Sequence, residues 1–283
     1  MGSYFVITMI QYPKNMNNLF KLAVIAVFAS SCGKKQDTTK DIPCIPNNLS
    51  NNVIAFYPFS NGSLDDVSGN NYHLINYSTA TSTSDRNNNP HCAYLFNNIS
   101  GQNEYLTRDN PTFLNNLNEM SISLWYELID STSNGALYSA LISRDTGQRC
   151  PDKDGQWAVG IYDCSRAVFG ANTSVWDKSI VPLDTPSVCR KEVMVRLNSW
   201  HHIVATWVKS TNEISIYRDG VLQQTTTGVG DCAPTNNTIA QDIGNLFLGR
   251  RFTGKIDDVI IFNKKLNQQE INTLYNMTTC CLD

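Results

Sequence analysis

The stretch Glu213-Ile-Ser-Ile-Tyr-Arg-Asp-Gly-Val-Leu-Gln-Gln-Thr225 decides the fold class of this chain. At its centre, Asp219-Gly220 separates two runs that are rich in apolar and β-branched residues. Glycine accepts the positive φ that a two-residue hairpin turn requires, and Asp-Gly is a strong signal for such a turn. The stretch therefore predicts a β-hairpin that joins residues 214–218 to residues 221–225.

Further short strands are predicted on both sides of this hairpin. Residues 121–128 have the period-two pattern that is typical of a strand. Other apolar segments of strand length lie between turn-forming clusters at 53–59, 136–143, 156–162, 167–170, 201–208, 246–249 and 255–262. One helix is predicted near the C-terminus, because Asn267 and Glu270 form a capping-box pattern before Ile271. This order of elements predicts an all-β fold.

Composition and charge narrow the class of protein. The chain has 283 residues, of which 41% are hydrophobic, and its net charge is −3. All-β sandwiches of roughly 200–250 residues commonly form one domain, so one domain is expected. The sequence contains no basic block of the kind that a nucleic-acid footprint requires, and nucleic acid is not an expected partner.

The N-terminus has the features of a signal peptide. Lys14 and Lys21 precede the apolar run 22–28, and small residues at 29–31 lead to Cys32. This region resembles a bacterial lipoprotein signal, although Ala29 stands where the lipobox usually has leucine. The resemblance implies cleavage after residue 31 and a lipidated Cys32. The polar residues that follow, with Pro43 and Pro46, predict a tether over 32–50 before a folded domain over 51–283. An ordinary secretory signal peptide is the alternative.

A lipoprotein would be a lipid-anchored membrane protein of the bacterial cell envelope, with the outer membrane as its expected location. Lys34 and Lys35 after the cysteine favour the periplasmic side. The cysteines agree with an oxidising compartment, because lipidation of Cys32 leaves an even number of the nine for disulfides. These eight are Cys44, Cys92, Cys150, Cys164, Cys189, Cys232, Cys280 and Cys281. Adjacent Cys280 and Cys281 are expected to reach different partners, and the pairing is otherwise open.

Several motifs follow one another along the chain: Phe56-Tyr57-Pro58-Phe59, Asp66-Val67-Ser68-Gly69-Asn70, Ser121–Trp125, Trp200–Val204 with Tyr217–Gly220, Leu248-Gly249-Arg250, Gly254–Val259 and Leu266–Tyr275. In this order they resemble the LamG-like jelly-roll family of the concanavalin A-like lectin/glucanase superfamily. The resemblance implies a two-sheet antiparallel jelly-roll sandwich with one short C-terminal helix. Two departures are Phe96-Asn97-Asn98, where the family usually has Phe-Asp-Gly, and a Cys-rich insertion at about 144–195.

The resemblance also implies a calcium ion between the opening loop and the closing strand. The candidate ligands are Asp66, Ser68, Asp257 and Asp258. Strand alternation would place Asp257 and Asp258 on opposite faces, each beside apolar residues. A half-buried carboxylate needs a cation or hydrogen-bond donors, so calcium is one expectation. The alternative is an Asx turn at Asp66 and a hydrogen-bonded structural Asp258.

The aromatic residues suggest where a ligand would bind. Sugar rings stack on exposed aromatic rings, and amide and carboxylate groups bond their hydroxyls. Tyr162, Asn172, Trp176 and Asp177 are the candidate ligand-binding residues in the loop-rich part of the chain. Trp157 is expected in the core, because Val159 and Ile161 share its face. Trp125, Trp200 and Trp207 are expected in the core as well.

No catalytic residues are assigned from the sequence. Adjacent His201 and His202 on a strand face opposite ways and cannot jointly bind zinc. The Glu-x-Asp-x-x-Glu run of the superfamily's glucanases is absent. We therefore predict a non-catalytic recognition module of a cell-envelope lipoprotein that binds carbohydrate or an extracellular protein. The alternatives are a glycoside hydrolase with an unrecognised carboxylate pair, and a structural or protein-binding envelope protein.

Overall fold

A computed structural model describes most of the chain outside its N-terminal region. The described residues are 40–99, 103–130, 139–145, 157–162, 166–171, 173–178, 197–228 and 244–282. They belong to one compact unit, and the predicted signal peptide and Cys32 lie outside the described residues. In the described ranges no helix combines the length and the apolar character that crossing a bilayer requires.

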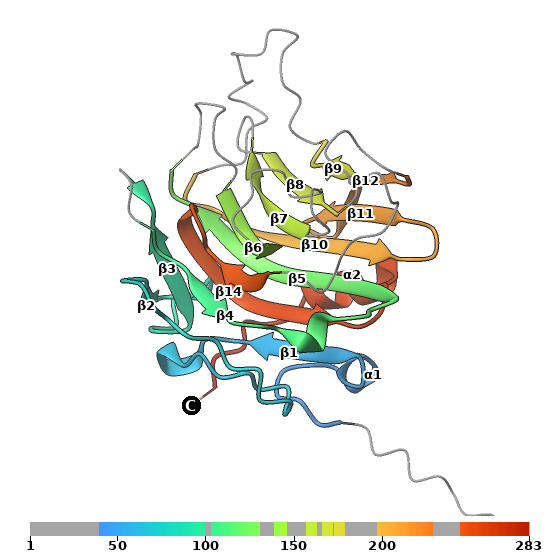
Figure 1. Cartoon of the computed structure of the whole chain (residues 1–283). Coiled ribbons are helices and arrows are strands. Elements are labelled where there is room, and N and C mark those ends of the chain that lie inside the picture. Colours follow the sequence, from blue (N-terminus) through green and yellow to red (C-terminus); the bar gives the residue numbers. More distant parts are fainter. Residues whose placement is uncertain are drawn as a thin grey trace, which may run out of the picture. The chain divides into compact units, whose positions relative to one another are not determined.

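The described strands form two antiparallel sheets, which confirms the predicted fold class (Figure 1). The first, sheet A, has the order β12 (Val221–Thr226), β11 (Glu213–Arg218), β10 (Trp200–Val208), β5 (Glu119–Leu128), β14 (Thr253–Phe262), β3 (Ala93–Asn97) and β2 (Thr81–Thr83), with β1 (Val53–Tyr57) also paired to β14. The second, sheet B, has the order β4 (Leu106–Arg108), β13 (Asn245–Leu248), β6 (Ser139–Asp145), β7 (Trp157–Tyr162), β8 (Arg166–Gly170) and β9 (Ser174–Trp176).

The predicted hairpin and C-terminal helix are both present. Asp219 and Gly220 have φ values of 50° and 79°, and Arg218 pairs with Val221 across the turn. Helix α2 (Gln268–Tyr275) begins after the N-cap Asn267, which forms the capping box with Glu270. Among the described residues, the other short helical segments are α1 (Asn47–Ser50), η1 (Ser60–Gly62) and η3 (Thr112–Leu114).

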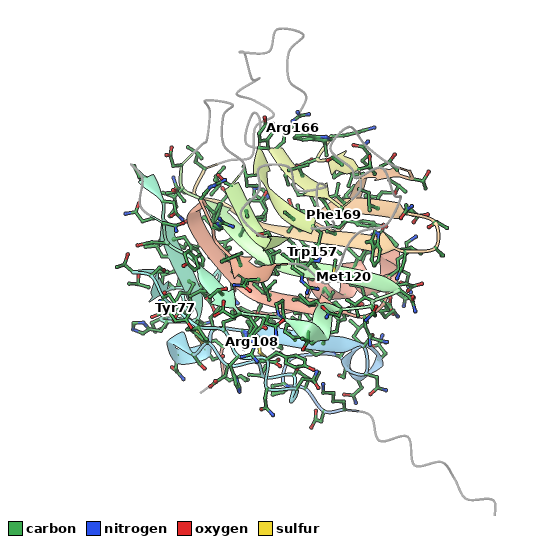
Figure 2. All side chains as sticks on the ribbon, viewed as in Figure 1. Tyr77, Arg108, Met120, Trp157, Arg166 and Phe169 are labelled. Atoms are coloured by element: carbon green, nitrogen blue, oxygen red, sulfur yellow. A yellow bond between two sulfur atoms is a disulfide. The ribbon has the colours of Figure 1, made fainter. Side chains whose placement is uncertain are left out.

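The main core lies between the two sheets, with buried Trp157, Phe169 and Trp207 among its largest side chains. The core positions predicted for Trp157 and Trp207 are thus confirmed, and Figure 2 labels Trp157 and Phe169 within the sandwich. The prediction is wrong for Trp125 and Trp200, which are half-buried. Leu124 beside Trp125 and Ile203, three residues after Trp200, face the inter-sheet core, so alternation places both rings on the outer face of sheet A.

A second apolar cluster covers the outer face of sheet A. Helix α2 contributes Ile271 and Leu274, and the N-terminal segment contributes Ile42, Ile45 and Leu49, all buried. Residues 42–50 were assigned to a polar tether from the sequence, and this assignment is corrected here. Burial of three apolar side chains makes this segment part of the folded domain.

Two disulfides join the C-terminal tail to this domain. Cys44 is bonded to Cys280, and Cys92 at the start of β3 is bonded to Cys281. The prediction that the two adjacent cysteines reach different partners is therefore confirmed. The other predicted disulfide cysteines, Cys150, Cys164, Cys189 and Cys232, lie outside the described residues.

Candidate functional site

Tyr162, Arg166 and Trp176 come together on the outer face of sheet B. Tyr162 and Arg166 are paired across β7 and β8, and Trp176 is paired with Val168 across β8 and β9. Their strand neighbours Ile161, Ala167 and Val175 lie in the inter-sheet core. Because side chains alternate along a strand, the three polar and aromatic residues point away from that core. We call this group the Trp176 platform.

The platform is a cluster of tilted rings and one guanidinium, with part of its surface exposed. The rings of Tyr162 and Trp176 have centroids 5.7 Å apart and are inclined by 55°. The Arg166 guanidinium carbon lies 4.4 Å from the centre of the Trp176 ring, within the range of a cation–π contact. All three side chains are half-buried. Figure 2 shows Arg166 at the opposite end of the domain from Tyr77 and Arg108.

Only some of the predicted ligand-binding residues lie together in the structure. Tyr162 and Trp176 meet, as described above, and Asn172 lies outside the described residues. Asp177 has no exposed surface, and its Oδ2 pairs with Arg218 Nε at 3.2 Å. We correct its predicted role accordingly, because a buried carboxylate that is paired with a guanidinium does not contact ligand hydroxyls.

In the opening loop, Asp66 forms an Asx turn. Its Oδ1 accepts hydrogen bonds from the backbone N–H groups of Phe56 and Ser68, at 3.0 and 2.9 Å. Its Oδ2 accepts from Ser68 Oγ at 2.9 Å and from the Tyr72 N–H at 3.0 Å. The buried carboxylate is therefore occupied by donors from its own loop and from β1.

Asp257 and Asp258 converge on one arginine. Arg86 Nη1 lies 2.7 Å from Oδ2 of each aspartate, and both carboxylates are fully buried. The sequence prediction that the two aspartates face opposite sides of β14 is wrong. Asp258 has φ of +45°, and the pairing of β14 with β5 shifts register between Asp257 and Ile260. This β-bulge inserts an extra residue into the strand, so alternation breaks and both carboxylates reach the same cation.

Arg86 is the residue that sequence reasoning missed. Its guanidinium carbon lies 4.5 Å from the centre of the Trp125 ring, and its Nη2 donates to the Met277 carbonyl at 3.3 Å. The backbone N–H of Cys280 also donates to Asp258 Oδ2, at 3.2 Å. The ion cluster therefore fixes the C-terminal tail. A signal was available, because Arg86 is the one cation in the polar stretch 78–92.

The donor set at these positions does not fit calcium. A calcium ion needs six to eight oxygen ligands, whereas Asp66 is filled by protein donors and Asp257 and Asp258 by a guanidinium. In the described part of the chain, the group of three that could hold a metal is Asp85, Cys92 and Cys281. Its two sulfurs are joined in a disulfide and are not available as ligands.

The two adjacent histidines face opposite sides of β10, in the arrangement that strand alternation implies. His202 is buried on the outer face of sheet A, where its Nε2 meets Ser123 Oγ at 2.8 Å. Burial lowers the pKa of His202 to about 3, so it is neutral at physiological pH. His201 faces the other way and its Nδ1 meets Asp219 Oδ2 at 2.8 Å. Both are structural residues.

The buried acid pair gives a prediction for pH dependence. Burial raises the pKa of Asp258 to about 6 and that of Asp257 well above its usual range, although Arg86 opposes both shifts. The folded state then binds protons more tightly than the unfolded state between pH 4 and 6, so acidification through this window stabilises the fold. His202 acts in the opposite direction, because its pKa is lowered in the folded state.

The prediction therefore concerns the difference in Tm between wild type and Asp258→Asn, because the His202 effect is the same in both proteins. As pH falls from about 7.5 to 5, the Tm of the wild type should rise relative to that of the variant. In the variant, Asp257 is the one remaining carboxylate beside Arg86, so the Tm of the variant should depend less on pH. Calorimetric scans at three pH values measure it. A constant Tm difference across this range would show that the pair does not titrate there.

Comparisons with known proteins agree with this architecture. A family model described as the concanavalin A-like lectin/glucanases superfamily matches residues 100–272. Among curated protein sequences, none matches the chain.

Solved structures provide a second comparison. Domain 4 of AbnA, an extracellular GH43 arabinanase from Geobacillus stearothermophilus solved in complex with arabinotriose, is 16% identical with a TM-score of 0.54, over 80% of this chain and 98% of that one. The binding domain of botulinum neurotoxin DC, in complex with rat synaptotagmin II, is 17% identical with a TM-score of 0.55, over 81% and 52%. Botulinum neurotoxin type C, whose cell entry depends on two ganglioside molecules, is 15% identical with a TM-score of 0.53, over 81% and 52%.

These neighbours are carbohydrate-binding or receptor-binding domains, and at such identities the likeness shows a shared fold. The chain spans nearly all of the arabinanase domain and about half the length of the toxin chains.

Proposed function

Because the chain belongs to the concanavalin A-like lectin/glucanase superfamily, we propose that it is a non-catalytic recognition module that binds carbohydrate at the Trp176 platform. The observation that carries the proposal is the partly exposed Tyr162–Trp176 pair on the outer face of sheet B. An aromatic face of this kind stacks on the C–H face of a sugar ring. The Arg166 guanidinium lies over the Trp176 ring and adds a positive charge to the platform.

The structural neighbours support a recognition role for this fold. The arabinanase domain was solved with arabinotriose, the toxin DC binding domain was solved with synaptotagmin II, and cell entry of toxin type C depends on gangliosides. A protein partner is therefore the second candidate for this chain. We favour carbohydrate, because the platform combines two partly exposed aromatic rings with a guanidinium rather than an extended apolar surface.

Hydrolysis is not assigned. Glycosidases generally place two carboxyl groups on either side of the bond that they cleave. Asp257 and Asp258 are close together, but both are buried and held by Arg86, so a substrate cannot reach them. Glu127 is also buried and paired, with Lys255 at 3.0 Å in a salt bridge.

We further propose that the module is anchored to the bacterial envelope through a lipid on Cys32. The charged, apolar and small segments that precede this cysteine support the proposal. Mass spectrometry of the purified protein tests it, because a lipoprotein has lost residues 1–31 and carries acyl groups on Cys32. A mature N-terminus elsewhere, or an unmodified Cys32, would reject it.

A glycan-array screen of the oxidised protein tests the recognition proposal, with one set of arrays in calcium and one in EDTA. We expect binding to at least one glycan family, with equal signal in the two conditions because the donor set does not fit calcium. Loss of signal in EDTA would restore the calcium prediction. No binding in either condition would move the assignment to a protein-binding or structural role.

A further inference from the structure

The open edges of the two sheets meet at Trp176. Strand β9 is the edge strand of sheet B, and β12 is the edge strand of sheet A. The backbone N–H of Trp176 donates to Gln224 Oε1 on β12, at 2.9 Å. Among the described residues, no further strand of sheet B pairs with β9. The Trp176 N–H is instead hydrogen-bonded to a side chain of sheet A.

The residue that follows Trp176 is held from the same hairpin. Asp177 is fully buried, and Arg218 Nε on β11 lies 3.2 Å from its Oδ2. The Asp177 N–H donates to the Ala167 carbonyl on β8, at 2.9 Å. Gln224 pairs with Ile216, which lies in the inter-sheet core, so Gln224 and Arg218 both reach across from the inner face of sheet A.

Arg218 is itself oriented by an ionic network. Asp219 Oδ2 lies 3.9 Å from Arg218 Nε and 2.8 Å from His201 Nδ1, while Oδ1 accepts from the His202 N–H at 2.9 Å. Burial alone would raise the pKa of Asp219, but the hydrogen bonds from His201 and His202 outweigh it and lower the pKa. Asp219 is therefore ionised at neutral pH, and the guanidinium lies between two carboxylates.

We infer that Gln224 and Arg218 are positioning residues for the Trp176 platform, so that sheet A sets the geometry of the recognition surface on sheet B. Gln224 fixes the Trp176 amide, and Arg218 fixes Asp177 beside it. The ligand-binding part of this inference rests on the proposed function. The positional part can be measured at Trp176 without a ligand.

The test uses the full-length oxidised protein labelled with 5-fluorotryptophan. Trp176→Phe assigns the Trp176 resonance in the ¹⁹F NMR spectrum. Gln224→Met keeps the length of the side chain but removes the acceptor, and Gln224→Glu restores an acceptor. Gln223→Met is the matched control, because this neighbour donates to Val221 on its own strand. The glycan array is repeated with each variant.

We expect Gln224→Met to shift or broaden the Trp176 resonance, while the resonance of buried Trp207 stays in place. In Gln224→Glu, the Trp176 resonance should return to its wild-type position. The array signal should fall about two- to tenfold in Gln224→Met, the equivalent of one neutral hydrogen bond. A Trp176 resonance unchanged in Gln224→Met would overturn the inference. If the resonance moves but wild-type protein binds no glycan, the positioning inference stands and the proposed function fails.

Discussion

Replacement of Arg86 by methionine should lower the free energy of unfolding by about 3–5 kcal/mol, the usual result when one partner of a buried ion cluster is removed. The substitution leaves Asp257 and Asp258 adjacent, buried and without their cation. It also removes the guanidinium from the Trp125 ring and from the Met277 carbonyl. Urea denaturation of both proteins, followed by tryptophan fluorescence, measures the difference.

A matched control separates the buried cluster from an ordinary surface pair. Lys264 lies 2.6 Å from Glu270 with its side chain about one quarter exposed, so Lys264→Met should lower the free energy of unfolding by about 0–1 kcal/mol. The triple variant Arg86→Met, Asp257→Asn, Asp258→Asn removes every charge of the cluster and should recover most of the lost stability. A loss in Arg86→Met no larger than in Lys264→Met would refute the structural role of Arg86.

Removal of the Cys44–Cys280 disulfide should have a similar effect, about 2–5 kcal/mol. This bond spans 236 residues of sequence and ties the N-terminal segment to the C-terminal tail. The expected loss is smaller than a loop of that length implies, because the Cys92–Cys281 bond still restrains the tail. The double substitution Cys44→Ser, Cys280→Ser avoids a stray thiol, and the urea midpoint gives the change.

The same pair of cysteines allows a control for packing. Cys280 is fully buried in the cluster beneath α2, so the double substitution Cys44→Ala, Cys280→Ala, which introduces no hydroxyl there, should lose nearly the same stability. Wild type treated with a reductant should be less stable than both variants, because the reductant also opens the Cys92–Cys281 bond that the variants keep. A urea midpoint that both substitutions leave unchanged would show that the bond does not stabilise the native fold.

Local chemistry made the hairpin and the helix predictable. Asp219-Gly220 supplies the two positive φ values of the turn, and Asn267 and Glu270 supply both halves of the capping box. Alternation along regular strands placed Trp157 in the core for the same reason. In each case, residues within a few positions of one another determine the structure.

The failures occur where distant residues determine the structure. The bulge at Asp258 breaks alternation, and Arg86, which holds the bulged carboxylates together, is 172 residues away in sequence. Asp177 looks like a ligand residue in a polar loop, but Arg218 from the other sheet buries it. Sequence periodicity assumes a regular strand and does not report which side chain arrives from another element.

The candidate site was predictable in part for a related reason. Trp176 and Tyr162 are aromatic residues in the loop-rich region, which sufficed to propose a sugar-stacking surface. Their actual juxtaposition depends on the pairing of β7, β8 and β9. The supporting contacts from Gln224 and Arg218 depend on how the two sheet edges meet, which no local pattern encodes.

The most direct test of the recognition proposal is isothermal titration calorimetry with the glycan that gives the strongest array signal. It compares wild type, Trp176→Ala and Tyr77→Ala, the last being an aromatic residue that is 63% exposed at the opposite end of the domain. We predict that Trp176→Ala abolishes measurable binding with an unchanged far-ultraviolet circular dichroism spectrum, while Tyr77→Ala binds like wild type. Equal affinity in wild type and Trp176→Ala would contradict the assignment of the Trp176 platform as the ligand site.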